Sequence, residues 1–276
     1  MDMPSSGECF KEFEFDLPCA LLRDLTQLLD GMGSASLDKA TVEESIPEAQ
    51  GVYQLFLDDT LVYIGKTDSE AGLRKRLTRH ARKIQHREKL DPARVSFKAV
   101  RIFVFTAVDL EQQLIKHYSG REDGLAWTNS GFGANDPGRK RDTTKLKENH
   151  FDVRYPINIK VGLGATATPG DFTVADVLAK LKEEVPYVVR FENNGRRARM
   201  PHVDLETARI TIPVGHPTAE DILGLIATAL PEWQITVLPG YIIIYREHQN
   251  YPHALKWWAR GQSGPSATKK PDDAMS

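Results

Sequence analysis

The chain has 276 residues, of which 41% are hydrophobic and 27% are charged, and its formal net charge is −2. These values are typical of a soluble globular protein and leave room for two domains. No apolar run reaches the ~18 residues of a membrane-spanning helix, and the first residues lack the basic and apolar regions of a signal peptide. Cys9 and Cys19 have no metal-ligand spacing, so we expect two reduced thiols in a cytoplasmic protein.

The first predicted helix covers residues 18–30, where leucines recur at helical spacing and Gly31 follows as a stop signal. We interpret it as a helix that covers the next domain. Residues 31–50 are predicted to be a connector. Residues 1–45 are therefore assigned to an N-terminal covering helix and connector.

Two β-type runs, residues 51–57 and 61–67, are joined by a short polar step that is typical of a β-hairpin. The first run begins with the triplet GVY, and the second contains the triplet YIG. A helix is predicted over about residues 70–89, and its period places Arg76 and His80 on one face. Tyrosine, lysine, arginine and histidine close to one hairpin are typical of a site that handles phosphate.

Two further elements follow the basic helix. Residues 95–105 are rich in β-branched and aromatic side chains and predict a third strand, and residues 109–118 predict a second helix. In that helix Glu111 lies toward the apolar face formed by Leu114 and Tyr118. A buried acid needs a partner, which is either a cation of the basic helix or a metal ion.

Positive charge is concentrated in one part of this nearly neutral chain. From Lys66 to Arg101 there are twelve lysine or arginine residues and four acidic residues. Such a stripe favours contact with a polyanion, and its ordinary alternative is a solvated helix face. Residues 119–150 are rich in Gly, Asn and Pro and predict a series of tight turns.

The C-terminal part shows a weak internal similarity with an offset of 45 residues. Thr173 and Thr218 begin two similar segments as predicted helix N-caps, and the same offset relates Pro186 to Pro231. Each segment is predicted to fold as helix–strand–strand, and chance similarity is the alternative. We expect one α+β domain over residues 170–260, followed by a disordered tail over 261–276.

The full series of motifs resembles the GIY-YIG nuclease superfamily. The residues that carry the resemblance are Gly51-Val52-Tyr53, Tyr63-Ile64-Gly65, Arg76, His80, Glu111 and Asn129. The segment NSGFGANDPGR, residues 129–139, is similar to the type II restriction endonuclease branch. Compared with the family, Val52 replaces isoleucine and residues 119–126 look like an insertion. The resemblance implies an α+β fold in which residues 46–165 form a three-stranded antiparallel sheet flanked by helices.

The same resemblance implies a function. It predicts a site-specific endonuclease for double-stranded DNA that hydrolyses phosphodiesters with Mg²⁺, for which Mn²⁺ is an expected substitute. Tyr53 would be the base and Glu111 the metal ligand, and the implied catalytic residues are Tyr53, Tyr63, Lys66, Arg76, His80, Glu111 and Asn129. We expect DNA contacts from Arg74, Arg79, Arg82, Arg87, Arg139 and Arg141. We also expect a homodimer, and a companion DNA methyltransferase in the same system that is not a stable subunit.

Three other interpretations stay open. The chain resembles repair, homing and structure-specific nucleases of the same superfamily as well. It would be a DNA-binding protein if the nuclease site were inactive, although all six superfamily positions are occupied. The C-terminal repeat would be the functional part if it were a protein-interaction module, and Arg196, Arg197 and Arg199 there would touch phosphates or form an ordinary exposed loop.

Overall fold

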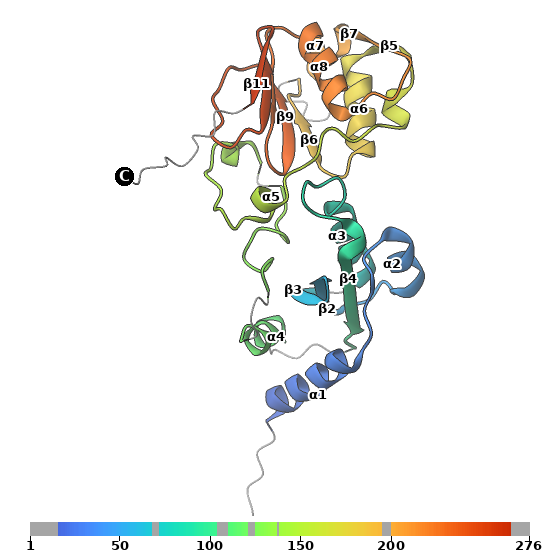
Figure 1. Cartoon of the computed structure of the whole chain (residues 1–276), viewed down its shortest axis with the longest axis vertical. Helices are drawn as coiled ribbons and strands as arrows, with labels where there is room; N and C mark the ends of the chain where they lie inside the picture. Colours follow the sequence, from blue (N-terminus) through green and yellow to red (C-terminus); the bar gives the residue numbers. More distant parts are fainter. Residues whose placement is uncertain are drawn as a thin grey trace, which may run out of the picture.

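The computed structural model describes residues 16–67, 72–103, 110–120, 125–136, 138–194 and 200–265. Figure 1 shows an N-terminal lobe (residues 16–120) and a C-terminal lobe (residues 161–265) that follow one another along the longest axis. A bridging segment (residues 125–160) runs between them. Both lobes combine helices with antiparallel strands, which confirms the α+β class.

The N-terminal lobe is built on a four-stranded antiparallel sheet in the order β1-β4-β2-β3. Its strands are β1 (Ala35–Ser36), β2 (Gly51–Leu57), β3 (Thr60–Thr67) and β4 (Val95–Arg101). Its helices are α1 (Leu17–Gly31), α2 (Lys39–Ser45), α3 (Leu73–Lys83) and α4 (Leu110–Tyr118), with a 3₁₀ turn η1 (Pro92–Arg94) before β4.

The predicted hairpin is confirmed as β2 and β3. Its turn consists of Asp58 and Asp59, whose φ angles are 48° and 61°. Positive φ at both central residues gives a two-residue turn the twist of the flanking strands. Arg94 pairs with the carboxylate of Asp58, so the 3₁₀ turn η1 before β4 also holds the hairpin turn.

Helix α3 is shorter than the predicted span of residues 70–89. It ends at Lys83, and His86 and Lys89 beyond it have φ angles of 49° and 63°, which an α-helix does not contain. The third strand ends at Arg101 instead of residue 105. The remaining parts of these predicted spans, residues 70–71, 104–105 and 109, lie outside the described residues.

Helices cover both faces of this sheet. On one face α3 buries Leu73 and Leu77 in a cluster with Leu55 of β2. On the other face α1 and α4 pack together, with Leu29 and Leu114 in a cluster that includes sheet residues. The first helix therefore packs on one face of the sheet, and the sheet lies between two helical layers.

The bridging segment contains little regular structure. It includes the 3₁₀ turn η2 (Arg139–Arg141) and the short helix α5 (Phe151–Arg154). Trp127, Phe132 and Phe151 pack into the core of the N-terminal lobe, whereas Ile157 and Ile159 belong to the core of the C-terminal lobe. The segment is thus fixed to both lobes.

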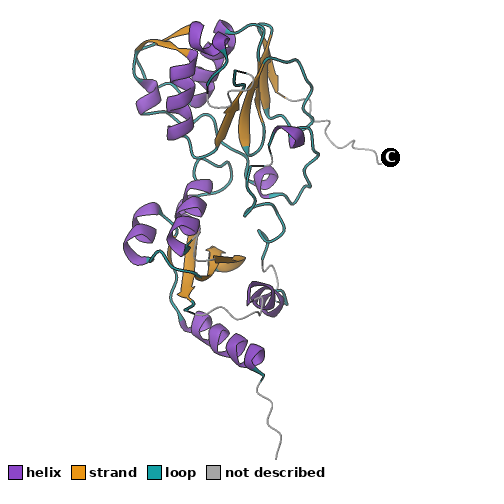
Figure 2. Ribbon diagram, turned by 180° about the vertical axis from the view of Figure 1, so that it is seen from behind, coloured by secondary structure: helices purple, strands orange, loops and turns teal. Residues whose placement is uncertain are grey.

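The C-terminal lobe contains a five-stranded sheet in the order β11-β10-β8-β9-β6 and a two-stranded sheet of β5 and β7. Figure 2 shows its main helices on one side of the larger sheet. The strands are β5 (Gly170–Thr173), β6 (Val188–Phe191), β7 (Arg209–Ile212), β8 (Gln234–Val237), β9 (Tyr241–Tyr245), β10 (Lys256–Ala259) and β11 (Gln262–Pro265). The helices are η3 (Ala165–Ala167), α6 (Val174–Glu184), α7 (Val203–Thr207) and α8 (Ala219–Ala229).

The two predicted N-caps are confirmed, because the side chains of Thr173 and Thr218 accept hydrogen bonds from the third residues of α6 and α8. The two segments nevertheless differ in how their strands pair. In the first, β7 pairs with β5 in the small sheet, whereas in the second, β9 pairs with β8 and lies parallel to β6. The helix–strand starts are alike, but the second strands are not equivalent.

The prediction of a disordered tail over residues 261–276 is wrong for the first residues of this range. Residues 262–265 form β11, which pairs with β10 through a turn at Arg260 and Gly261. Residues 266–276 lie outside the described residues, as do Cys9 and Arg196–Arg199. Among the helices that the structure describes, none is both long and apolar enough to cross a membrane.

Candidate active site

Three predicted site residues converge at the start of the hairpin. The hydroxyl oxygen of Tyr53 lies 2.8 Å from Nε2 of His80, which is a hydrogen-bonding distance. The ring of Tyr63 lies 6.1 Å from that of Tyr53 and 5.7 Å from that of His80, measured between centroids. We call Tyr53, Tyr63 and His80 the tyrosine–histidine cluster.

Two glycines make room for this cluster. Gly65 faces Tyr53 across the hairpin, and a Cβ atom at this position would lie 2.4 Å from the tyrosine ring. A Cβ atom on Gly133 would lie 2.4 Å from the hydroxyl oxygen of Tyr63. The glycine of the YIG triplet is therefore required by the ring of the GVY triplet, and the bridging segment closes over Tyr63.

Arg76 and Glu111 act on both tyrosines. Burial is the main cause that raises the pKa of Tyr53, and the phenol of Tyr63 raises it further. Burial and then Glu111 raise the pKa of Tyr63, and the charge of Arg76 opposes both shifts. Both phenols are therefore protonated at neutral pH, in the field of Glu111 and Arg76, and the charge of Arg79 also acts on Tyr63.

His80 is neutral at physiological pH. Burial lowers its pKa well below 6.5, and the nearby cations Arg79, Lys83 and Arg76 lower it further. Within the described residues its Nδ1 atom is buried without a hydrogen-bond partner. Nε2 is therefore the ring nitrogen through which this imidazole is hydrogen-bonded to the phenol of Tyr53.

Phe132 completes the cluster and was missed by the sequence analysis. Its ring stacks on His80 with centroids 4.7 Å apart, and it meets Tyr63 edge-on at 5.2 Å. Phe132 is fully buried although it lies in a Gly-rich loop. A single aromatic residue between two glycines was the available signal, because large apolar side chains in such loops usually pack against something.

The structure does not bring every predicted catalytic residue to the cluster. Lys66 is exposed at the end of β3. Asn129 is also exposed, has a φ angle of 60°, and makes no contact with the cluster among the described residues. The site assembled by the described residues is therefore Tyr53, Tyr63, Arg76, His80 and Glu111, with Phe132 above it.

The predicted DNA-binding arginines differ in their surroundings. Arg79 is exposed, and its guanidinium group donates to Asn135 and Gly133 of the bridging segment. Arg74 and Arg82 also donate to backbone carbonyl groups, whereas Arg139 pairs with Glu247. Arg141 is exposed on η2.

Arg87 does not fit a role in binding DNA at the surface. Its side chain is only 3% exposed, and its guanidinium group lies 2.7 Å from the carboxylate of Asp152. It also donates to the backbone oxygens of Lys83 and Tyr155. This arginine ties α3 to α5, and the prediction of a phosphate contact is wrong for the structure seen here.

Glu111 is the carboxylate whose charge acts on both tyrosines. No group of three or more His, Cys, Asp or Glu side chains within the described ranges is arranged around a common metal position. One carboxylate oxygen donor suits Mg²⁺, which keeps several waters and takes further oxygen ligands from a bound phosphate. The donor set around Glu111 therefore fits Mg²⁺ bound together with substrate.

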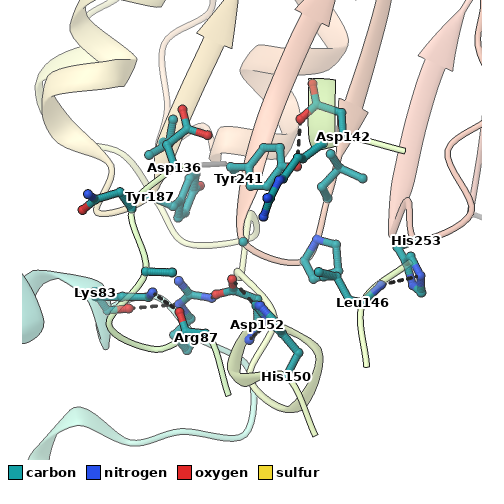
Figure 3. A pocket seen from close by; sticks show the side chains of 18 of the residues that line it. Lys83, Arg87, Asp136, Asp142, Leu146, His150, Asp152, Tyr187, Tyr241 and His253 are labelled. Atoms are coloured by element: carbon teal, nitrogen blue, oxygen red, sulfur yellow. Dashed lines mark hydrogen bonds and ion pairs between the residues drawn. The ribbon is translucent and has the colours of Figure 1, made fainter. Parts of the chain in front are cut away.

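A cavity of about 430 Å³ lies next to this site, between the bridging segment and the C-terminal lobe. Figure 3 shows Lys83, Arg87 and Asp152 on one side of it and Tyr187 and Tyr241 on the other. Arg79 and Lys83 of α3 line the cavity. In the sequence, Arg79 directly precedes His80, and Lys83 follows it by about one helical turn. The cavity and the tyrosine–histidine cluster therefore share one helix.

Comparison with known proteins gives no relatives from which the roles of these residues could be transferred. A scan against models of protein families finds no match to this chain, and a search of curated proteins finds no similar sequence.

Proposed function

We propose that this protein is a site-specific endonuclease for double-stranded DNA, of the restriction type within the GIY-YIG superfamily. The observation that carries the proposal is the 2.8 Å contact between the hydroxyl group of Tyr53 and Nε2 of neutral His80. At neutral pH the phenol keeps its proton, because its ordinary pKa is ~10, so on its own it cannot take a proton from water. A hydrogen-bonded neutral imidazole gives the phenol's proton a place to go.

The proposed reaction begins with a water molecule next to the cluster. Tyr63 is partly exposed whereas Tyr53 is buried, so Tyr63 is the phenol that orients this water. As the water attacks phosphorus, its proton passes to the oxygen of Tyr53, and the proton of Tyr53 passes to Nε2 of His80. The bond from phosphorus to the leaving oxygen then breaks, the leaving oxygen takes a proton from solvent, and the histidine later returns its proton to solvent.

Charge on the phosphate needs compensation. Arg76 has the geometry to bind two phosphate oxygens with one guanidinium group, and its charge already acts on both tyrosines. Glu111 would hold Mg²⁺, which stabilises the developing negative charge and the leaving oxygen when bound. Exposed Arg79 and Arg141 would contact neighbouring backbone phosphates.

The direct test is incubation of the purified protein with a mixture of plasmids in Mg²⁺, followed by sequencing of the ends. Discrete fragments with a common end sequence support the proposal. Wild-type protein that yields no cleavage in Mg²⁺ or Mn²⁺, on DNA that covers all short sequences, contradicts it. Cleavage that depends on DNA branches instead of sequence would favour a structure-specific nuclease of the same superfamily.

We also propose a homodimer, because cutting both strands of a symmetric site requires two copies of the tyrosine–histidine cluster. A restriction enzyme would also require a companion DNA methyltransferase to protect the host DNA. Sedimentation of an inactive variant with and without duplex DNA tests the assembly. A complex with one protein per duplex, which accumulates nicked plasmid before linear product in the active form, would contradict the dimer.

A further inference from the structure

We propose that the cavity between the bridging segment and the C-terminal lobe binds a nucleotide, with the base inside and the phosphate at the rim. The nucleotide is either an extrahelical residue of bound DNA or a free mononucleotide. The first source rests on the proposed DNA-cutting function, whereas the second does not.

The size and the wall of the cavity fit a heterocyclic base. Its volume of about 430 Å³ lies within the ~300–1,000 Å³ typical of small-molecule sites. Much of the wall is apolar, with Leu146 from the bridging segment, Val188 from β6, and Leu238 and Pro239 from the turn after β8. A flat aromatic ring gains by leaving water for such a wall.

The charged side chains deep in the wall already have protein partners. Arg87 pairs with Asp152, and the buried carboxylate of Asp142 binds Arg190 and accepts a hydrogen bond of 2.8 Å from Tyr241. Lys83 donates to the backbone oxygens of residues 131 and 132. Because Arg87 and Asp142 are paired with opposite charges and the ammonium group of Lys83 is bound by backbone oxygens, the interior favours a neutral ring over a small anion.

Neutral hydrogen-bonding groups are present for the edges of a base. Burial raises the pKa of Tyr187, so its hydroxyl group remains a neutral donor and acceptor at physiological pH. His150 and His253 also line the cavity, and both use one ring nitrogen to accept a backbone hydrogen bond. The other ring nitrogen of each neutral imidazole then carries the proton and is a donor.

The rim has the opposite character. Arg79 and Arg141 line the cavity and are exposed, which places two cations where the phosphate of a bound nucleotide would lie. Arg79 is next to His80 on α3, so a phosphate at the rim is close to the tyrosine–histidine cluster. An interior whose charged side chains already have protein partners, beneath a cationic rim, matches the division of a nucleotide into base and phosphate.

The test uses two variants that fill the cavity and one matched control. Val188→Trp and Leu146→Trp place a large ring in the cavity from two different elements. Val203→Trp makes the same change at an exposed position on α7 that does not line the cavity. Circular dichroism checks that each full-length protein is folded.

Calorimetry in EDTA measures binding of the four deoxynucleoside monophosphates and of inorganic phosphate. We expect at least one nucleotide to bind about tenfold more tightly than phosphate, since the base adds buried apolar area. Both cavity-filling variants should weaken that binding at least ~10-fold, and the control should stay within ~2-fold of wild type. The inference would be overturned if no nucleotide bound and the DNA experiment below gave no fluorescence change. It would also be overturned if the control variant lost as much nucleotide affinity as the cavity-filling variants.

A DNA arm distinguishes the two sources. A duplex with 2-aminopurine opposite an abasic site offers a base that is easily extruded. If DNA supplies the nucleotide, its fluorescence should change with wild type and the control but not with the cavity-filling variants. If only mononucleotides bind, the free nucleotide is the source. A protein that cuts plasmid but fails both arms contradicts this inference alone, and one that binds nucleotides but never cuts contradicts the proposed function alone.

Discussion

The ring of Phe132 stacks on the imidazole of His80, with centroids 4.7 Å and planes 21° apart. Phe132 belongs to the bridging segment and His80 to α3, so through this stack the bridging segment covers the site. One helical turn further, Lys83 donates to the backbone oxygen of Phe132 and holds the loop in place. Phe132, which has no reactive group, thus covers one face of the buried histidine.

We therefore predict that Phe132→Ala raises the pKa of His80 toward its ordinary ~6.5, because water then solvates the imidazolium ion. Truncation of a buried phenylalanine should also cost about 3–5 kcal/mol of stability. NMR titration of His80 measures the first effect and urea unfolding the second. Phe132→Leu is the control for volume, and an unchanged pKa in the alanine variant would contradict the covering role.

The two tyrosines should differ in their kinetic effects. If Tyr53 accepts the proton of water, Tyr53→Phe should reduce single-turnover cleavage at least ~10²-fold, the usual effect of removing a general base. Tyr63→Phe should cost less, because it removes only an orienting hydroxyl group. Tyr155 packs on Trp127 and is not part of the cluster, so Tyr155→Phe is the matched control. A larger loss in Tyr63→Phe than in Tyr53→Phe would reverse the two roles.

Glu111→Gln should abolish cleavage and leave DNA binding nearly unchanged. The substitution keeps the side-chain shape but removes the negative charge that a Mg²⁺ ion needs. It should also lower the pKa of Tyr63, since Glu111 raises it in the wild type. Plasmid cleavage and gel-shift binding measure the first pair of effects. Wild-type cleavage in EDTA would contradict the metal role.

Stability should depend on pH through His80. In the folded state its pKa lies well below the ~6.5 of the unfolded chain, so below pH ~6.5 the unfolded state binds more protons. The free energy of unfolding should be constant above this pH and fall as the pH drops toward the folded pKa. His86 and His150, whose pKa values are also lowered, add to the same slope.

Urea unfolding of His80→Phe between pH 5 and 8 checks this linkage. The variant should lose part of the acid sensitivity, at most ~1.4 kcal/mol for each unit of pKa shift. His248→Phe changes an exposed histidine and is the matched control. Equal acid sensitivity in His80→Phe and wild type would show that His80 does not contribute.

Asp142 should be important for stability because it holds the bridging segment against the C-terminal sheet. Its carboxylate is 1% exposed and binds Arg190 of β6. Breaking a buried pair on one side typically costs ~3–5 kcal/mol, so Asp142→Asn should lower the urea midpoint strongly. Asp58→Asn, which breaks the exposed pair with Arg94, should have a much smaller effect. A double-mutant cycle with Arg190→Met isolates the pair.

Local sequence signals predicted the elements that depend on local chemistry. The hairpin turn at Asp58 and Asp59, the N-caps at Thr173 and Thr218, and the leucine stripe of α1 were all found in this way. The predicted end of α3 was too late. The chain leaves the helix after Lys83 to pair with the bridging segment, and no Gly or Pro marks this point in the sequence. β10 and β11 were missed, although Arg260-Gly261 was an available turn signal.

Local sequence signals could not predict the features that join distant parts of the chain. The parallel pairing of β6 with β9 joins residues about fifty positions apart, and no local pattern encodes it. The same holds for the pairing of Asp142 with Arg190 and for the nucleotide-sized cavity. The motif residues Tyr53 and His80 were identified through the resemblance of the motif series to the GIY-YIG superfamily, whereas the role of Phe132 depends on how a loop folds back.

The order of these contacts along the chain has a consequence for synthesis on the ribosome. Tyr53, Tyr63 and His80 emerge early, and Asp142 follows, but its partners Arg190 and Tyr241 emerge about fifty and one hundred residues later. Until then the bridging segment is attached to the N-terminal lobe alone. We expect a nascent chain that stops before β9 to form the hairpin and to cover His80 with Phe132, while the hydroxyl group of Tyr241 is still missing from Asp142. Stalled chains of increasing length should therefore show the bridging segment fixed to the C-terminal lobe only after β9 has been translated.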